Sequence, residues 1–531
     1  MKTKKPIIWS VSGSDCSGGA GIAADIKTGH SLGVEVCTLI TANTVQSSTE
    51  LISINPVPID ILQQQVSVLI KDKPPLVIKI GLLATVEQVI WLTSTLVKLK
   101  QTLSTLIVVY DPVGQASVGG CFNTFSLTDL APLLQQIDVI TPNMIEATVL
   151  VDISLKMENK QLSAEMLAKE IYQLFSINSV IIKGGHNSDS EQCTDFCLHQ
   201  LNQLKQDNQD KNHQAICYQL SSSRISSSYS HGGGCSFASA LASFLALGYL
   251  VRDAFTLTKA FINQGLIATQ AVSSAQHHNY YGAFEQLAWP PASTGTTNNF
   301  PQVVDKLNQQ YQNLPAFNPL NLQDEKLGLY PVIDSLYWLK RLLPLGLKII
   351  QLRVKNLPVN KLDQVISEAV KLAKDYDTRL FINDYWQLAI RHNAYGVHIG
   401  QEDLCNADLV KIQQAGLRLG ISTHGCYEFL LAQQLQPSYL AVGAVFPTKT
   451  KDMTGQIQGL GNLSQILALR TQQLEQTVPV VAIGGINLVR APAVLATGVE
   501  SIAVVTAITN AEQLSGKTPE QAVSQFLQLI G

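Results

Sequence analysis

Short apolar runs rich in valine and isoleucine alternate with amphipathic helical stretches along almost the whole chain. Such runs predict buried strands, and the helical stretches between them predict the crossover connections of a parallel sheet. In the first half the runs are Ile7 to Val11, Cys37 to Ala42, Val77 to Ile80, Leu106 to Tyr110, Val139 to Ile140 and Val180 to Ile182. The pattern predicts an α/β fold whose mainly parallel sheet carries helices on both faces.

The second half repeats this alternation more regularly. Its eight runs are Leu329 to Ile333, Ile349 to Leu352, Leu380 to Ile382, Gly396 to Ile399, Leu417 to Ile421, Tyr439 to Val442, Val478 to Ile483 and Ile502 to Val505. Eight strands separated by helices predict a (β/α)8 barrel of the TIM type. A chain of 531 residues is also too long for one core.

The periodic pattern stops between the two halves. Residues 291–325 are rich in Ser, Thr, Asn, Gln and Pro, with one short helical stretch from Val303 to Gln312. This composition predicts a linker. We therefore expect one domain over residues 1–290, a linker over 291–325 and a barrel over 326–531.

The composition argues against several classes of partner. The chain is 46% apolar and 15% charged with a net charge of −3, which favours neither nucleic acid nor an anionic membrane. No apolar run approaches the roughly 20 residues of a membrane span. The nine cysteines are scattered without a C-x-x-C pair, which fits a reducing compartment. We expect a cytoplasmic protein with small-molecule partners, and homo-oligomerisation stays open.

Polar residues follow the apolar runs of the first half, where the carboxyl ends of parallel strands form a ligand site. The glycine-rich loop from Ser12 to Gly21 follows the first run, and Gln46, whose amide could pair with a heterocycle, follows the second. As an isolated residue, Gln46 would more often be a solvated loop residue. Carboxylates and a lysine at later strand ends suit Mg²⁺ and a polyphosphate; the residues are Asp111, Asn143, Glu146 and Lys183.

The stretch from His231 to Cys235 contains three consecutive glycines and leads into a helical segment of small residues. Glycines let the backbone turn without Cβ obstruction, and the following helix would direct its free N–H groups at an anion. Cys235 falls on the first helical turn, where the helix dipole favours a thiolate, so we expect a proton acceptor. A glycine-rich turn that only caps a buried helix is the alternative.

These motifs together resemble the hydroxymethylpyrimidine and phosphomethylpyrimidine kinases of the ribokinase-like superfamily. The likeness covers roughly residues 6 to 270 and rests on SGSDCSGGAGIAADIKT, ITANTVQ, KIGLLA, DPV, ITPNMIEA, IKGGH and HGGGC, in the order of the family. The resemblance implies ATP-dependent phosphorylation of a hydroxymethyl group and then of the resulting monophosphate.

The resemblance also implies residue roles. Gly13, Asp25 and Gln46 match pyrimidine-binding positions, and Asp111, Asn143, Glu146 and Lys183 lie on the side of ATP and Mg²⁺. The anion hole and the base would be Gly232, Gly233, Gly234 and Cys235. The sequence departs from the family where Thr and two Met are usual, at Gly233, Gly114 and Leu82.

Polar residues also follow the runs of the second half, and they converge on one rim of the predicted barrel. They include cations, two carboxylates, hydroxyl groups and a glycine pair. These are the groups expected to bind Mg²⁺ and two phosphorylated ligands. These residues resemble thiamine phosphate synthase over about 327 to 510. The likeness implies Mg²⁺ at Asp384 and Asp403, the pyrimidine pyrophosphate at Gln351, Arg353, Lys355, Asn383, Ser422 and Lys451, and the thiazole phosphate at Thr448, Thr450, Gly485, Val505 and Thr506.

The two resemblances predict one bifunctional enzyme of thiamine biosynthesis. The first domain would convert 4-amino-5-hydroxymethyl-2-methylpyrimidine into its pyrophosphate, and the second would couple that product to thiazole phosphate. In two alternatives the second domain is still an active synthase, but the first domain has another role. In one, the first domain is a pyridoxal-type kinase. In the other, it is a catalytically silent pyrimidine-binding regulatory module, which the departures at Gly114 and Gly233 motivate.

Overall fold

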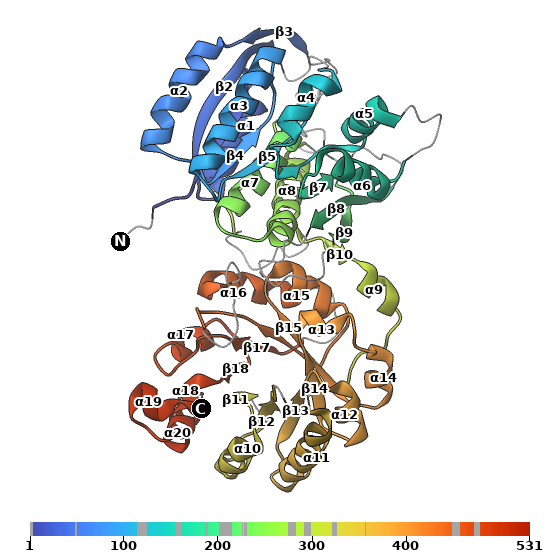
Figure 1. The fold of residues 1–531 in the computed structure, drawn as a ribbon, viewed down its shortest axis with the longest axis vertical. Helices are drawn as coiled ribbons and strands as arrows, with labels where there is room; N and C mark the ends of the chain where they lie inside the picture. Colours follow the sequence, from blue (N-terminus) through green and yellow to red (C-terminus); the bar gives the residue numbers. More distant parts are fainter. Residues whose placement is uncertain are drawn as a thin grey trace. The chain divides into compact units, whose positions relative to one another are not determined.

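The computed structural model consists of two compact units, residues 1–305 and 306–531 (Figure 1). It describes residues 4–47, 50–113, 125–155, 162–185, 190–200, 215–225, 227, 231–273, 283–290, 299–320, 327–355, 357–448, 457–471 and 478–530. No helix among these residues is long and apolar enough to span a membrane.

The first unit is built on a ten-stranded sheet with the order β10-β9-β8-β7-β6-β5-β4-β1-β2-β3. The six strands from β7 to β2 in this order run parallel, and the strands at both edges pair antiparallel. The strands are β1 (Ile7–Asp15), β2 (Glu35–Gln46), β3 (Leu51–Pro56), β4 (Val77–Ile80), β5 (Ile107–Tyr110), β6 (Val139–Ile140), β7 (Ser179–Ile182), β8 (Gln192–Gln200), β9 (Ala215–Ser223) and β10 (Gln302–Val304).

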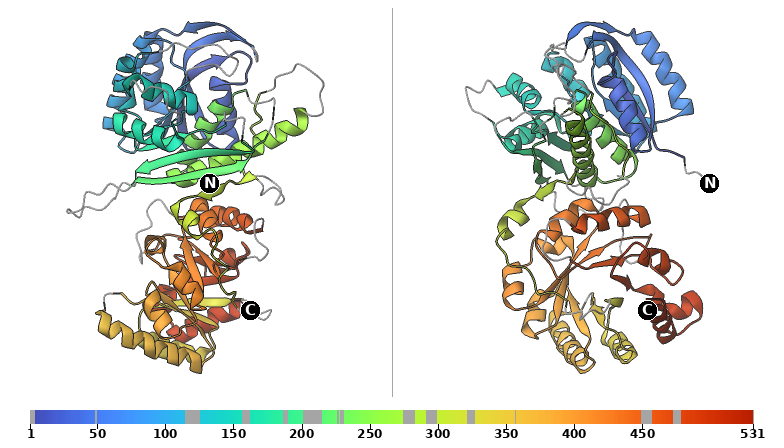
Figure 2. Two further views of the ribbon diagram at one scale, coloured as in Figure 1. Left: turned by 90° about the vertical axis from the view of Figure 1, so that its right-hand side faces the viewer. Right: turned by 180° about the vertical axis from the view of Figure 1, so that it is seen from behind.

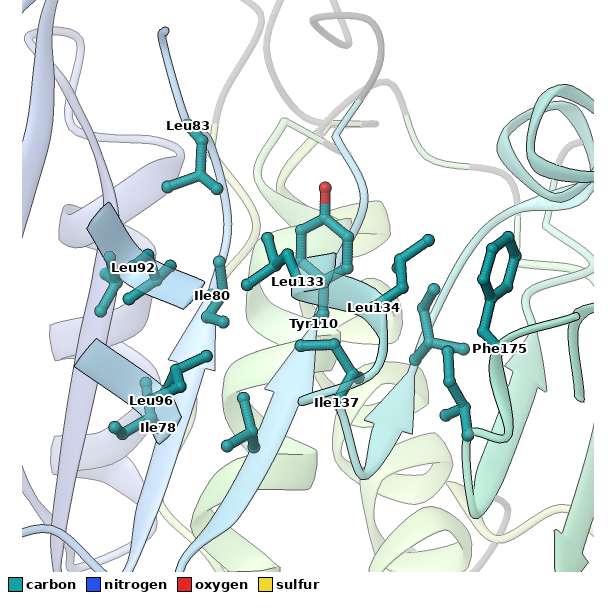
Figure 3. Close-up of a cluster of buried hydrophobic side chains, with 14 of the residues drawn as sticks. Ile78, Ile80, Leu83, Leu92, Leu96, Tyr110, Leu133, Leu134, Ile137 and Phe175 are labelled. Atoms are coloured by element: carbon teal, nitrogen blue, oxygen red, sulfur yellow. The ribbon is translucent and has the colours of Figure 1, made fainter. Parts of the chain in front are cut away.

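Helices lie on both faces of this sheet, as the sequence predicts. They are α1 (Gly21–Ser31), α2 (Ile59–Asp72), α3 (Val86–Thr102), α4 (Leu127–Leu134), α5 (Met144–Leu155), α6 (Ala164–Phe175), α7 (Gly233–Ala246) and α8 (Val251–Ser273). Successive side chains of β4 point to opposite faces of the sheet and show what packs on each face. Ile78 and Ile80 belong to a core cluster with Leu92 and Leu96 of α3 (Figure 3), whereas Lys79 between them bonds to α1 on the other face.

The second unit contains a closed barrel of eight parallel strands, so the prediction of a (β/α)8 barrel is confirmed. Figure 2 shows the helices around the outside of the strands. The strands are β11 (Gly328–Ile333), β12 (Ile349–Leu352), β13 (Arg379–Asn383), β14 (Gly396–Ile399), β15 (Arg418–Thr423), β16 (Tyr439–Val442), β17 (Val480–Ile483) and β18 (Ser501–Val504).

The helical elements of the second unit alternate with its strands. They are α9 (Lys306–Tyr311), α10 (Leu336–Leu342), η2 (Leu343–Leu345), α11 (Val359–Asp375), α12 (Trp386–Arg391), α13 (Gln401–Leu404), α14 (Leu409–Gln414), α15 (Cys426–Gln433), α16 (Gly459–Ala468), η3 (Leu469–Thr471), α17 (Ala491–Leu495), α18 (Thr506–Thr509), α19 (Ala511–Ser515) and α20 (Pro519–Ile530). Buried aromatic rings fill the barrel, among them Tyr330, Phe381 and Tyr439.

The predicted linker overlaps with ordered elements. Residues 302–304 form β10, which pairs antiparallel with β9 of the first unit. Asn263 of α8 donates a hydrogen bond to the carbonyl of Asn299 at 2.8 Å, and the ring of Phe300 contacts that of Trp289. Residues 299–305 therefore belong to the first unit, and the expected domain limits stay a prediction.

Candidate active sites

Two glycine-rich loops of the first unit meet at the carboxyl end of β1. Gly232, the residue before α7, has a φ of +82°, which favours glycine. A Cβ at Gly232 would collide with the carbonyl oxygen of Gly19, and a Cβ at Gly19 would collide with the ring of His231. The absence of these side chains allows the loop before α1 to contact the loop before α7.

A contact between a histidine and a carboxylate, which the sequence did not indicate, joins the same two loops. His231 Nε2 lies 2.9 Å from Asp15 Oδ2, and both side chains are buried. The carboxylate also accepts hydrogen bonds from the backbone N–H groups of Ser17, Gly19 and Ala20. Burial alone would raise the pKa of Asp15, but these hydrogen bonds hold it well below its usual range. Asp15 is therefore ionised at neutral pH.

Cys235 is the third residue of α7, as the glycine motif predicts. Burial raises the pKa of its thiol, Lys79 lowers it, and Asp25 and Asp111 raise it further. The net result is a thiol pKa above the ordinary value, so Cys235 holds its proton at neutral pH. Burial and two carboxylates thus outweigh Lys79 and the helix dipole that favours a thiolate, and the role of Cys235 as proton acceptor stays a prediction.

Lys183 and Asp111 form an ion pair beside the anion loop. Lys183 Nζ lies 2.7 Å from Asp111 Oδ1, which also accepts a hydrogen bond from Thr141 at 3.1 Å. A Cβ built at Gly234 would be 3.6 Å from Lys183 Nζ, so this glycine lies next to the ammonium group. Burial lowers the pKa of Lys183, but Asp111 and Glu146 raise it above its usual value. Lys183 therefore presents a positive charge to the loop.

Asn143 and Glu146 bond to each other at the start of α5. The backbone N–H of Asn143 donates to Glu146 Oε2 at 2.7 Å, and the N–H of Glu146 donates to Asn143 Oδ1 at 2.9 Å. A β-bridge pairs Asn143 with Lys183, which brings this turn next to the end of β7. The four residues predicted on the side of ATP and Mg²⁺ thus come from neighbouring strand ends.

The three residues predicted to bind a pyrimidine differ in their surroundings. A Cβ at Gly13 would lie 2.8 Å from Leu82, so the leucine that replaces the usual methionine contacts this position. The partly exposed side-chain amide of Gln46 makes no hydrogen bond within the described part of the chain. Asp25, in contrast, has no exposed surface and bonds to Lys79. A direct contact between Asp25 and a ligand stays a prediction.

On the barrel, hydrogen bonds connect three of the predicted rim residues. Gln351 at the end of β12 donates to Asn383 Oδ1 at 2.6 Å, and Asn383 at the end of β13 donates to the carboxylate of Asp384. Asp384 has a φ of +65°, and its N–H bonds to the carbonyl of His398 at 2.9 Å. This network orients the amides and the carboxylate relative to one another.

A second network leads from the barrel core to Ser422. The hydroxyl groups of Tyr330 and Tyr439 are 2.7 Å apart, His398 Nδ1 is 2.7 Å from the Tyr439 hydroxyl, and His398 Nε2 is 2.8 Å from Ser422 Oγ. Burial first, and then the charges of Arg353 and His424, lower the pKa of His398 to about 3. The imidazole is therefore neutral, with one nitrogen a donor and the other an acceptor.

The available acceptors determine which group is the donor in each hydrogen bond of this network. Among the described residues, the hydroxyl of Tyr330 bonds only to that of Tyr439. The Tyr330 hydroxyl proton therefore has Tyr439 as its acceptor. If Tyr330 donates to Tyr439, then Tyr439 donates to His398, and His398 Nε2 donates to Ser422. The Ser422 hydroxyl proton is then free for a ligand. Tyr330, His398 and Tyr439 were not predicted from the sequence, because they lie within strands and not at the strand ends.

The remaining predicted rim residues follow their strands as expected. Lys355, Asp403 and Thr506 are exposed, whereas Arg353, Thr448 and Val505 are partly buried. Gly485 has a φ of +62°, and a Cβ there would lie 2.6 Å from the carbonyl oxygen of Pro447. The predicted ligand-binding residues Thr450 and Lys451 lie outside the described residues, as does Gly114 of the first unit.

The rim residues fit a magnesium ion of the usual kind. No group of three or more His, Cys, Asp or Glu side chains is clustered as a metal site within the ranges that the structure describes. Mg²⁺ is normally held by one or two carboxylates together with substrate phosphates and water, and not by a cage of protein ligands. Asp384, which accepts a hydrogen bond from Asn383, and the exposed Asp403 are the two carboxylates predicted at this rim, and their binding of Mg²⁺ stays a prediction.

Comparison with known proteins matches each unit separately. The family model of phosphomethylpyrimidine kinase matches residues 15–280, half of the chain, and that of thiamine monophosphate synthase matches residues 329–508. The thiamine-phosphate synthase of Yersinia pseudotuberculosis is 54% identical over 209 residues, which are 39% of this chain and 92% of that protein. The chain belongs to both families.

The thiamine-phosphate synthase of Photorhabdus laumondii is 51% identical to the synthase barrel over 220 residues, 41% of this chain and 96% of that protein. A solved pyridoxal kinase from Staphylococcus aureus matches the kinase unit at 24% identity with a TM-score of 0.44, covering 57% of this chain and 98% of its own. That TM-score is below 0.5, and the fold assignment rests on the strand orders above. The protein is a bifunctional enzyme of thiamine biosynthesis, a kinase unit followed by a synthase barrel.

Proposed function

We propose that the kinase unit phosphorylates 4-amino-5-hydroxymethyl-2-methylpyrimidine twice and that the synthase barrel consumes the product. Each phosphorylation transfers the γ-phosphoryl group of one ATP and releases ADP, first to the hydroxyl and then to the monophosphate. The barrel then joins the pyrimidine methylene carbon to the nitrogen of thiazole phosphate and releases pyrophosphate. We place these reactions in the cytoplasm, which the scattered cysteines support.

In the kinase unit, the residues around the anion loop divide into three groups. We assign Gly13 and Gln46 to the pyrimidine, with the buried Asp25 behind them. Lys183, Asp111, Asn143 and Glu146 take the ATP side, where Mg²⁺, when bound, neutralises phosphate charge. Gly232, Gly233 and Gly234 hold the transferred phosphoryl group, and Cys235, in its deprotonated form, accepts the proton of the attacking hydroxyl. The positive charge of Lys183 beside Gly234 supports this arrangement.

The barrel rim holds two ligands in this proposal. Asp384 and Asp403 would hold Mg²⁺, which would offset charge on the departing pyrophosphate. Gln351, Arg353, Lys355, Asn383, Ser422 and Lys451 hold the pyrimidine pyrophosphate. Thr448, Thr450, Gly485, Val505 and Thr506 hold the thiazole phosphate. The electron-rich aminopyrimidine stabilises a methylene cation when pyrophosphate departs, and the thiazole nitrogen captures that cation, so no general base is needed.

The observation that carries the proposal is that one chain contains both families and that the product of one reaction is the substrate of the other. The test is mass spectrometry of products formed by the intact chain from hydroxymethylpyrimidine, ATP, Mg²⁺ and thiazole phosphate. We expect the monophosphate, the pyrophosphate and thiamine phosphate to appear in that order. ATP consumption with pyridoxal but not with hydroxymethylpyrimidine would contradict the kinase assignment, as would an active synthase with no kinase turnover.

A further inference from the structure

Lys79 of β4 and Asp25 of α1 form an ion pair with no exposed surface. Lys79 Nζ lies 3.0 Å from each oxygen of the Asp25 carboxylate. A Cβ at Gly81 would be 3.0 Å from the same nitrogen, so this glycine leaves room for the ammonium group. Buried ion pairs add little stability in general because desolvation offsets the attraction. A function other than stability therefore has to be considered for this pair.

The Asp25 carboxylate has no acceptor capacity left for a ligand. Besides the two hydrogen bonds from Lys79, Ser10 of β1 donates to Oδ2, and Ser239 of α7 donates to Oδ1 at 2.5 Å. A carboxylate offers about four lone-pair sites, and four donors fill them here. A pyrimidine would have to displace one of these buried donors to reach Asp25.

The same pair is bonded to α7, the helix that carries Cys235, through Ser239. Ser239 follows Cys235 by four residues on α7, so the two side chains share one face of that helix. Four charged groups from four elements face the thiol or interact with it; they are Lys79 on β4, Asp25 on α1, Asp111 after β5 and Lys183 after β7. Lys79 is the strongest of the charges that act on Cys235, and Asp25 opposes it.

We propose that Lys79 and Asp25 are positioning residues for Cys235: the pair anchors α7 and balances the charge around the thiol, and it acts through Cys235 without touching a substrate. The catalytic part of this inference rests on the proposed role of Cys235 as proton acceptor. The electrostatic part does not, because it concerns the thiol itself. The two partners should therefore have opposite effects on the thiol, although they belong to the same ion pair.

The experiment is a titration of Cys235 in the full-length protein. The alkylation rate by iodoacetamide is measured against pH by mass spectrometry of the peptide that contains Cys235, in the wild type, Asp25→Asn and Lys79→Gln. We expect the pKa of the thiol to fall in Asp25→Asn and to rise in Lys79→Gln, each by about one unit, or about tenfold in rate at a fixed pH. Shifts in the same direction, or no shift in either variant, would overturn the proposal.

The kinase unit offers a matched control pair. Lys259 of α8 and Asp195 of β8 form another buried ion pair, with Nζ and Oδ2 2.8 Å apart, and neither is among the groups that most affect the pKa of Cys235. Lys259→Gln and Asp195→Asn remove buried charges of the same kind and should leave the titration of Cys235 within a few tenths of a unit. If the control variants shift the pKa of the Cys235 thiol as much as the Lys79 and Asp25 variants do, a general loosening of the fold is responsible and the proposal fails.

A charge-free double variant covers the case in which a single variant does not fold. Asp25→Asn combined with Lys79→Gln leaves no unpaired charge, so the pKa of the Cys235 thiol should return to near its wild-type value; a shift of a full unit would overturn the inference. The pH profile of the first phosphorylation separates the two proposals. If the thiol pKa shifts as expected while the kinase profile does not, the pair acts on Cys235 but Cys235 is not the proton acceptor.

Discussion

At the scale of single residues, the chemistry depends on partners that lie far apart in the sequence. Cys235 keeps its proton because burial and the carboxylates of Asp25 and Asp111 outweigh Lys79. Only the thiolate can accept a proton, so Cys235 acts as a base only through the small fraction that is deprotonated. Such a limited base suits phosphoryl transfer, in which positioning and charge neutralisation lower the barrier more than proton removal does.

We expect Cys235→Ala to slow the first phosphorylation by about 100-fold, since general bases contribute on the order of 10²–10⁴. The second phosphorylation, which attacks through a phosphate oxygen, should be affected less. ADP release with hydroxymethylpyrimidine measures the first step, and coupling of supplied pyrimidine pyrophosphate provides the control. The exposed Cys405→Ala is the matched variant. Equal loss of kinase and synthase activity in Cys235→Ala would contradict two separate sites.

Asp403→Ala should abolish the coupling reaction and leave ATP consumption unchanged, because one of the two carboxylates proposed for Mg²⁺ is removed from the rim. The neighbouring Glu402→Ala changes the same charge without that role, so it should retain coupling. Thiamine phosphate formation at increasing Mg²⁺ concentration is the measurement. A normal rate in Asp403→Ala at low Mg²⁺ would remove this residue from the metal site.

At the scale of elements, the apolar runs predicted the parallel strands because a strand buried on both faces reads as continuous valine and isoleucine. The strands β8 and β9 were missed because their sequences, QCTDFCLHQ and AICYQLSSS, mix polar and apolar residues, as antiparallel strands near a sheet edge do. The strand ends were predicted as sites for the same topological reason. The contacts of Asp15 with His231 and of Lys79 with Asp25 join residues 216 and 54 positions apart, which no local pattern reveals.

The pairing of β7 and β8 contains a buried histidine, from which we expect the stability of the kinase unit to depend on pH. Ser179 Oγ lies 2.8 Å from His199 Nδ1, and burial first, then Arg252, lowers the pKa of His199 from 6.5 to about 4. As pH falls from 6.5 to 4, the unfolded chain binds a proton that the folded unit does not bind, so the folded unit loses stability.

We expect this loss to be on the order of 2 kcal/mol and to be absent in His199→Gln. Urea midpoints of the kinase-unit transition at pH 7 and pH 4.5 measure it in both proteins. The urea midpoint of the variant should lie closer to that of the wild type at pH 4.5 than at pH 7, or even above it at pH 4.5. An equal pH dependence in the two proteins would show that another group is responsible.

At the scale of the whole molecule, the first unit extends beyond the point at which its sequence pattern stops. The polar composition after residue 290 predicted a linker, yet Val303 is fully buried and β10 pairs with β9. Composition could not indicate this strand, because three residues of an edge strand are too few to produce a periodic signal.

A chain that ends at residue 290 should be less stable than one that ends at residue 305, because it lacks β10 and leaves β9 as an exposed edge. We expect a lower thermal midpoint and concentration-dependent self-association for residues 1–290, with neither change for residues 1–305. Differential scanning fluorimetry and light scattering after size-exclusion chromatography measure these properties. Identical behaviour of the two fragments would show that β10 contributes nothing to the unit.

The position of β10 in the sequence also determines when the kinase sheet can be completed during synthesis. A chain grows from its N-terminus, so the last strand of the kinase sheet is synthesised only after the helices and loops of the whole unit. The kinase sheet is therefore complete only when synthesis is about to enter the barrel. A gene fusion or split that preserves both enzymes has to fall after residue 305, because the apparent spacer carries a structural part of the kinase.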